Sequence, residues 1–213
     1  MTDAASTPNL EFFTFFPRPV RREASPPVIV RALVVLLQRK ANSLSFDYEA
    51  GRTYDLSVNS LADVLKQVAI ARDAQIPPLP AYSPTTGPGT RRRGRRKLSL
   101  NVGQASYVIL KLSDKDDWQF PSNDPPFALG RDALDANFFN AKKVSADGLN
   151  IDAQGDGCRV AYMGVLGSQN PRQEFININI ELLDRGNDGI DQKIPIVIDP
   201  DIGWPEGTNP DGP

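Results

Sequence analysis

Residues 175–182 read Phe-Ile-Asn-Ile-Asn-Ile-Glu-Leu, and this stretch decides the fold class. An isoleucine or leucine occupies every even position, and a polar residue occupies every odd position from 177 to 181. This period of two is the pattern of a β-strand whose two faces meet different surroundings. We therefore expect a strand that buries its isoleucines in a core and turns its asparagines and Glu181 toward water.

Similar patterns recur along the second half of the chain. Apolar and polar residues alternate at 98–102, isoleucines occupy 194, 196 and 198, and strongly apolar runs occupy 105–112 and 158–166. Pro195 has no amide proton to donate, so we expect the strand at 194–198 at a sheet edge. Because these strands follow one another without a repeating strand–helix pattern, the chain is predicted to be mainly β, an antiparallel β-sandwich with long loops.

A small hairpin and helix are predicted ahead of the sandwich. Residues 28–38 are apolar and β-branched, which favours a buried strand, although the two preceding prolines would also suit a helix. Within residues 43–58, apolar and polar residues alternate on both sides of an expected turn at 49–52, which is typical of a hairpin. Ser60, with an aspartate three residues later, begins a capping-box pattern, and the apolar spacing after it predicts a helix that ends near Ala74.

These elements divide the chain into five segments. We expect a flexible or partner-docked arm at 1–27, a strand, hairpin and helix at 28–76 packed on the main domain, a Pro/Gly-rich basic loop at 77–97, the sandwich at 98–204 and a polar tail at 205–213. Within the sandwich, long loops between 113 and 157 are expected to be anchored by Trp118, Phe120, Phe127, Phe138 and Phe139.

Positive charge gathers in the basic loop. Six of its residues form a nearly continuous run: Arg91, Arg92, Arg93, Arg95, Arg96 and Lys97. Arginine forks match phosphate oxygens, so the run is a candidate site for a polyanion or a nucleic acid. No fold-level nucleic-acid motif accompanies it, and a solvated loop is the alternative interpretation.

The N-terminal arm carries a cluster of aromatic residues that are unfavourable to expose to water: Phe12, Phe13, Phe15 and Phe16. Such side chains are expected to pack on the chain's own core or on a partner. Charge is also segregated, because residues 1–97 hold 15 Lys and Arg against 8 Asp and Glu, whereas residues 98–213 hold 9 against 18. These features predict a non-catalytic structural or protein-interaction protein that assembles with itself, as a homo-oligomer, or with another protein.

The residue counts exclude several kinds of chemistry. The chain of 213 residues has no histidine and one cysteine, Cys158. A Ser-His-Asp triad and ordinary zinc sites are therefore excluded, and the sequence predicts no enzyme, no cofactor and no metal site. A lone thiol, the lack of a long apolar run and the lack of a signal-peptide pattern predict a cytoplasmic protein without membrane contact.

Acidic residues near the C-terminus leave one catalytic alternative open. Asp184, Asp188 and Asp191 could hold magnesium in a carboxylate enzyme. Residues 191–193 also have the acid-x-lysine spacing of one large nuclease group, although the flanking helices of that group are not predicted. The paired acids at 199–201 are more typical of a turn.

The C-terminal pattern also resembles a known family. An alternating strand, an Asp/Gly turn and the sequence Ile198-Asp199-Pro200-Asp201-Ile202 resemble small bacterial inclusion-body-type β-sandwich proteins. The resemblance includes no specific motif, and it implies no activity and no residue role.

Overall fold

The computed structural model of the chain describes residues 19–20, 23–25, 31–39, 46–76, 99–102, 104–130, 135–167, 172–185, 191–198 and 201–204. The predicted assembly site at Phe12–Phe16 and the predicted polyanion site at Arg91–Lys97 lie outside these residues. The same holds for Asp188.

Five strands form the first sheet, in the order β2-β1-β4-β8-β7. Their bounds are β1 Arg31–Arg39, β2 Phe46–Asp55, β4 Ser106–Leu112, β7 Phe138–Val144 and β8 Val160–Val165. β1 and β4 run parallel, whereas the other neighbours run antiparallel. A parallel pair needs a long crossover, and here the chain from β1 to β4 passes through β2 and the helix.

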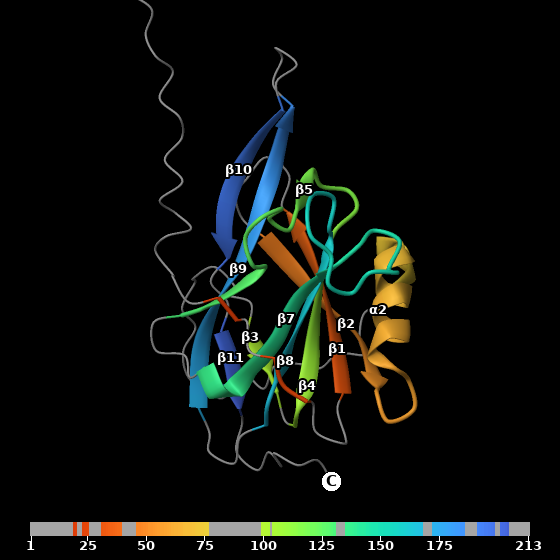
Figure 1. Ribbon diagram of the computed structural model, residues 1–213, viewed down its shortest axis with the longest axis vertical. Helices are drawn as coiled ribbons and strands as arrows, with labels where there is room; N and C mark the ends of the chain where they lie inside the picture. The colour runs from red at the N-terminus through yellow and green to blue at the C-terminus, as the bar shows by residue number, and fades with distance from the viewer. Residues whose placement is uncertain are drawn as a thin grey trace, which may run out of the picture.

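The second sheet is built on the long strand β9, Arg172–Arg185. Four strands pair with β9 antiparallel, and β3 pairs with β11 in parallel. The bounds are β3 Ser99–Asn101, β5 Trp118–Gln119, β6 Phe127–Leu129, β10 Asp191–Ile198 and β11 Asp201–Trp204. In Figure 1 the strands β9 and β10, drawn in blue, extend beyond the other strands.

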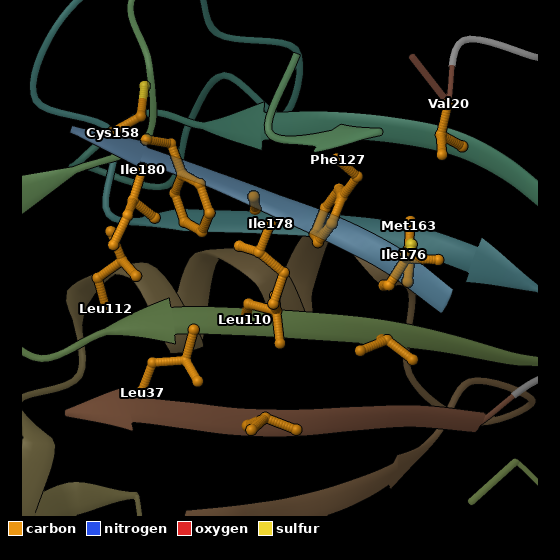
Figure 2. Packing of buried hydrophobic residues seen from close by; sticks show 14 of the residues in the cluster. Val20, Leu37, Leu110, Leu112, Phe127, Cys158, Met163, Ile176, Ile178 and Ile180 are labelled. Atoms are coloured by element: carbon orange, nitrogen blue, oxygen red, sulfur yellow. The ribbon is translucent and has the colours of Figure 1, made fainter. Parts of the chain in front are cut away.

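The main core lies between the two sheets. Figure 2 shows side chains of β9 facing side chains of β1 and β4 across this core. The labelled residues are Val20, Leu37, Leu110, Leu112, Phe127, Cys158, Met163, Ile176, Ile178 and Ile180. The mainly-β sandwich prediction is therefore confirmed, and the sheets are mixed because they contain two parallel pairs.

A second apolar cluster covers the outer face of the first sheet. The helix α2, Leu61–Ile70, packs Val64, Leu65 and Val68 against it (Figure 1). The Ser60 side chain accepts a hydrogen bond from the Asp63 N–H, as the capping pattern predicts. The helix ends earlier than expected and is followed by a short 3₁₀ helix, Asp73–Gln75.

One expectation about local structure is wrong. Residues 49–52 do not turn, because β2 continues through them and pairs with β1 on both sides. The register shifts between Leu33 and Val35, so the break in the pattern is a β-bulge within one long strand.

The long loops expected between 113 and 157 are present, with the short strands β5 and β6 and the strand β7 among them. All five predicted aromatic anchors are buried: Trp118, Phe120, Phe127, Phe138 and Phe139.

The polar face of β9 also differs from its prediction. Asn177 and Asn179 are buried rather than exposed to water. The segment before β6 lies against them, since the Asn179 Nδ2 donates to the Pro125 carbonyl oxygen at 3.0 Å. The alternation therefore separates an apolar face from a polar one, but it does not tell which face meets water.

Candidate functional site

Five polar side chains meet where β5, β9 and β10 approach two loops. We call this group the Lys193 cluster, and its members are Gln119, Ser122, Asp156, Glu181 and Lys193. Gln119 lies directly opposite Glu181 in the pairing of β5 with β9. Directly opposite residues on one face of a sheet lie close enough for their side chains to interact.

The ammonium of Lys193 is the centre of the cluster. Its Nζ donates to the Ser122 Oγ at 2.8 Å and to the Asp156 Oδ1, and it lies 3.8 Å from the Glu181 Oε2. The side chains of Lys193 and Asp156 are 39% and 62% exposed, so both are accessible from water. The cluster therefore presents a cation and two anions to a ligand from solution.

Buried Gln119 holds the two carboxylates in place. Its Nε2 donates to the Asp156 Oδ1 at 3.1 Å and to the Glu181 Oε2 at 3.0 Å. Its Oε1 accepts from the Gly157 N–H at 2.8 Å, which fixes the orientation of the amide. Gly155 and Gly157 both have positive φ angles, 87° and 81°, which glycine adopts without strain and which place Asp156 at the tip of this loop.

The carboxylates use only part of their hydrogen-bonding capacity. Asp156 receives its hydrogen bonds at Oδ1, and Glu181 receives its bond at Oε2. Within the described residues, the second oxygen of each side chain accepts no hydrogen bond. The Asp156 side chain is 62% exposed, so its second oxygen faces a ligand more openly than that of Glu181, whose side chain is 14% exposed.

A buried lysine supports the loop that carries Ser122. Lys143 in β7 donates from Nζ to the carbonyl oxygens of Pro121 and Ser122, the latter at 2.9 Å. Burial lowers the pKa of Lys143 below its ordinary value. Nearby Cys158 is also buried, and burial raises the pKa of its thiol, as expected of an inert cysteine.

The ion pair between Asp156 and Lys193 makes the stability of the fold depend on pH. Hydrogen bonds from Lys193 and Ser122 lower the pKa of Asp156 from 3.8 to about 2. Because the folded pKa lies below the ordinary value, the stabilisation is present above pH 3.8 and is lost as the pH falls toward 2.

We expect this effect of pH on stability to be small, since Asp156 is largely exposed. Thermal unfolding of the wild type and of Asp156→Asn between pH 5 and pH 2.5 checks it. The gap in melting temperature between the two proteins should narrow over this range, and a constant gap would contradict the assignment.

Of the acidic residues predicted from the sequence, Asp188 and the side chain of Asp191 lie outside what the structure describes. Lys193 belongs to the acid-x-lysine pattern, and the described carboxylates that pair with it are those of Asp156 and Glu181. Asp184 is exposed and is not part of the cluster. Sequence reasoning missed the other four members of the cluster. The one local pattern that could have pointed to them is the Gly-Asp-Gly sequence at 155–157.

Two negative findings concern the described part of the chain. It contains no group of three or more His, Cys, Asp or Glu side chains arranged to hold a metal ion. None of its helices combines the length and apolar character needed to cross a membrane.

The fold and the Lys193 cluster define a β-sandwich with mixed sheets and an accessible charged site. A family model described as "Predicted novel nucleotide synthetase" matches residues 63–207, and the chain belongs to that family. An inclusion body protein, PixA, from Burkholderia cenocepacia J2315 is 12% identical, with a TM-score of 0.30 over 87% of this chain and 97% of that chain. A likeness this distant carries no functional argument. No curated protein matches the chain.

The family match corrects the functional prediction. The sequence patterns predicted a non-catalytic structural protein, and the family description names a nucleotide synthetase, so that prediction is wrong. The absence of histidine excludes only the reactions that need it, whereas phosphate chemistry can use lysine and carboxylates. The predicted partners at Arg91–Lys97 and at Phe12–Phe16 stay predictions.

Proposed function

We propose that this protein is an enzyme of nucleotide synthesis and that its reaction takes place at the Lys193 cluster. Membership of the family supports the class of reaction. The position of the reaction site is supported by one observation, namely that an accessible ammonium, two carboxylates and a hydroxyl lie close together. The proposal keeps the cytoplasmic location predicted from the sequence.

The cluster suits substrates that carry phosphate groups. Forming a nucleotide requires such substrates, and enzymes promote these reactions mainly by positioning them and stabilising their charge. Lys193 is the group that would bind a phosphate, and the hydroxyl of Ser122 can donate to the same group. When a phosphate binds, it replaces a carboxylate as the partner of the Lys193 ammonium, so the lysine stays paired with an anion.

The carboxylates fit a second role in the same reaction. Magnesium that accompanies a nucleotide is usually held by one or two carboxylates together with the phosphates, rather than by a complete cage of protein ligands. Asp156 and Glu181 each have one oxygen free for such contact among the described residues. Gln119 keeps both carboxylates in position while Lys193 changes partner.

Replacing Lys193 by methionine is expected to lower the rate of nucleotide formation by roughly 100-fold, the usual effect of removing one charge-stabilising donor. The assay incubates the purified chain with nucleoside triphosphates, sugar phosphates and magnesium, and identifies new nucleotides by mass spectrometry. Lys115→Met is the matched control, because Lys115 is exposed and lies outside the cluster.

Asp156→Asn should reduce the rate in the same assay, since it removes one candidate magnesium contact. Equal rates for the wild type, Lys193→Met and Lys115→Met would place the reaction elsewhere. A wild-type chain that forms no nucleotide from any of these substrates would contradict the proposed function itself.

A further inference from the structure

Asn140 in the edge strand β7 has an unusual backbone conformation. Its φ angle is 51°, and it is the one described residue other than glycine with a positive φ. The register of β7 against β8 shifts between Phe139 and Lys142, so Asn140 lies in a β-bulge. Bulges often redirect a side chain, and a residue held in this region of backbone space often belongs to a binding site.

The side chain of Asn140 binds a short segment from the N-terminal part of the chain. We call residues 23–25 the docked segment. The Asn140 Oδ1 accepts from the Ala24 N–H at 2.8 Å, and the Asn140 Nδ2 donates to the Ala24 carbonyl oxygen at 2.8 Å. The side-chain amide of Asn140 therefore binds the N–H donor and the carbonyl acceptor of Ala24 at the same time. The adenine edge offers the same pair, an amino group and a ring nitrogen, and asparagine recognises it by the same two bonds.

The docked segment also makes an apolar contact. Ala24 packs against the outer apolar cluster, which contains Tyr107, Phe139 and Tyr162. These three rings are buried, and the ring centroid of Tyr107 is 5.7 Å from that of Phe139 and 5.9 Å from that of Tyr162.

A lysine beside Asn140 holds the acidic residue of the same segment. The Lys142 Nζ lies 3.1 Å from the Glu23 Oε1 and 3.2 Å from the Asp152 Oδ2. The Glu23 side chain is mostly exposed, so water competes for this ion pair. The docked segment thus places the Glu23 carboxylate on Lys142 and the peptide edge of Ala24 on the Asn140 amide, and it packs Ala24 on the outer apolar cluster.

We propose that the docked segment occupies a binding site for an adenine nucleotide, in which Asn140 takes the adenine edge and Lys142 takes the phosphate. The inference rests on the proposed function for the class of ligand. The segment and the nucleotide exclude each other, so the N-terminal part of the chain regulates access to the site. Among the described residues, the segment is held by two neutral hydrogen bonds, one exposed ion pair and the apolar packing of Ala24, a set of contacts that a ligand of matching chemistry can replace.

Titration calorimetry of the full chain with adenosine monophosphate tests the proposal. Ala24→Pro removes the N–H that occupies the Asn140 Oδ1, and we expect it to tighten binding by three- to tenfold, roughly the effect of one hydrogen bond. Asn140→Asp removes the donor for the ring nitrogen and should weaken binding at least tenfold. Asn59→Asp, an exposed change of the same kind, should leave the affinity unchanged.

Purine riboside monophosphate, which lacks the amino group, distinguishes recognition of the base from binding of phosphate alone. We expect it to bind about tenfold more weakly than adenosine monophosphate, as for the loss of one hydrogen bond. Equal affinities for the two ligands, or equal affinities of the wild type, Ala24→Pro and Asn140→Asp, would overturn the proposal. If Asn140→Asp does not fold, the side-chain amide resonances of Asn140 in the wild type give a second measurement, because they must shift on binding.

The failure of this inference can be told from the failure of the proposed function. Nucleotide formation at the Lys193 cluster without binding at Asn140 would remove the inference alone. Binding that depends on Asn140, in a chain that forms no nucleotide, would remove the proposed function alone.

Discussion

Replacing Trp118 by alanine is expected to lower the free energy of unfolding by about 3–5 kcal/mol. Trp118 is fully buried in the main core, between the two sheets. Its indole Nε1 also donates to the Ser113 carbonyl oxygen at 3.0 Å, so the change leaves a cavity and removes one of the hydrogen bonds that this oxygen accepts. A loss of this size is a large part of the stability of an ordinary domain.

The matched control for this prediction is Trp118→Phe. Phenylalanine keeps most of the buried ring but cannot donate to Ser113, so we expect a loss of about 1–2 kcal/mol. Urea unfolding followed by far-ultraviolet circular dichroism measures both variants without relying on tryptophan fluorescence. A loss below about 1 kcal/mol for the alanine variant would show that Trp118 is not an anchor of the core.

Replacing Lys111 by methionine is expected to destabilise the chain by about 3 kcal/mol. Lys111 is 1% exposed and lies in β4, under the end of α2. Its Nζ donates to the carbonyl oxygens of Val68 at 3.3 Å and of Ala71 at 2.5 Å. A cation at this end of a helix satisfies carbonyl groups that have no partner within the helix, and it stabilises the helix dipole.

Methionine has nearly the same shape as lysine, so a loss of stability in this variant reports the lost charge and hydrogen bonds rather than a cavity. Lys115→Met serves as the control here too, because its side chain is exposed, and it should change stability by less than about 0.5 kcal/mol. Equal unfolding curves for the two variants would mean that Lys111 does not cap α2. Hydrogen exchange at the last turn of the helix should be faster in Lys111→Met alone.

The strand β7 connects the two candidate sites. Neighbouring residues of a strand point to opposite faces. Lys143 points toward the loop of the Lys193 cluster, whereas Lys142 pairs with the docked segment. The same strand therefore contacts both candidate sites, through two neighbouring lysines.

The fold was largely predictable because its signals are local. The strands at 105–112 and 158–166 and the edge position of Pro195 agree with β4, β8 and β10. The apolar residues of β9 are buried as the alternation predicts. The turn at 49–52 failed because a β-bulge and a turn break the alternation in the same way.

The candidate sites were largely unpredictable because their members are far apart in the chain. Lys193 had a recognisable spacing with Asp191, but Asp156 and Glu181, which pair with it, come from other parts of the chain. Asn140 has no local signal, since a positive φ at a bulge depends on how β7 pairs with β8. The exclusion of histidine chemistry was sound, but it did not exclude an enzyme.

The type of structure, the course of most strands and the start of the helix follow from local patterns, because periods of two and 3.6 residues and a capping residue act over a few neighbours. Which polar residues meet depends on how the strands pair and how the sheets pack. Ser122 and Lys193 are 71 residues apart, and Ala24 and Asn140 are 116 apart. Such contacts follow from the pairing and layering of whole strands, and no local pattern of residues encodes that pairing.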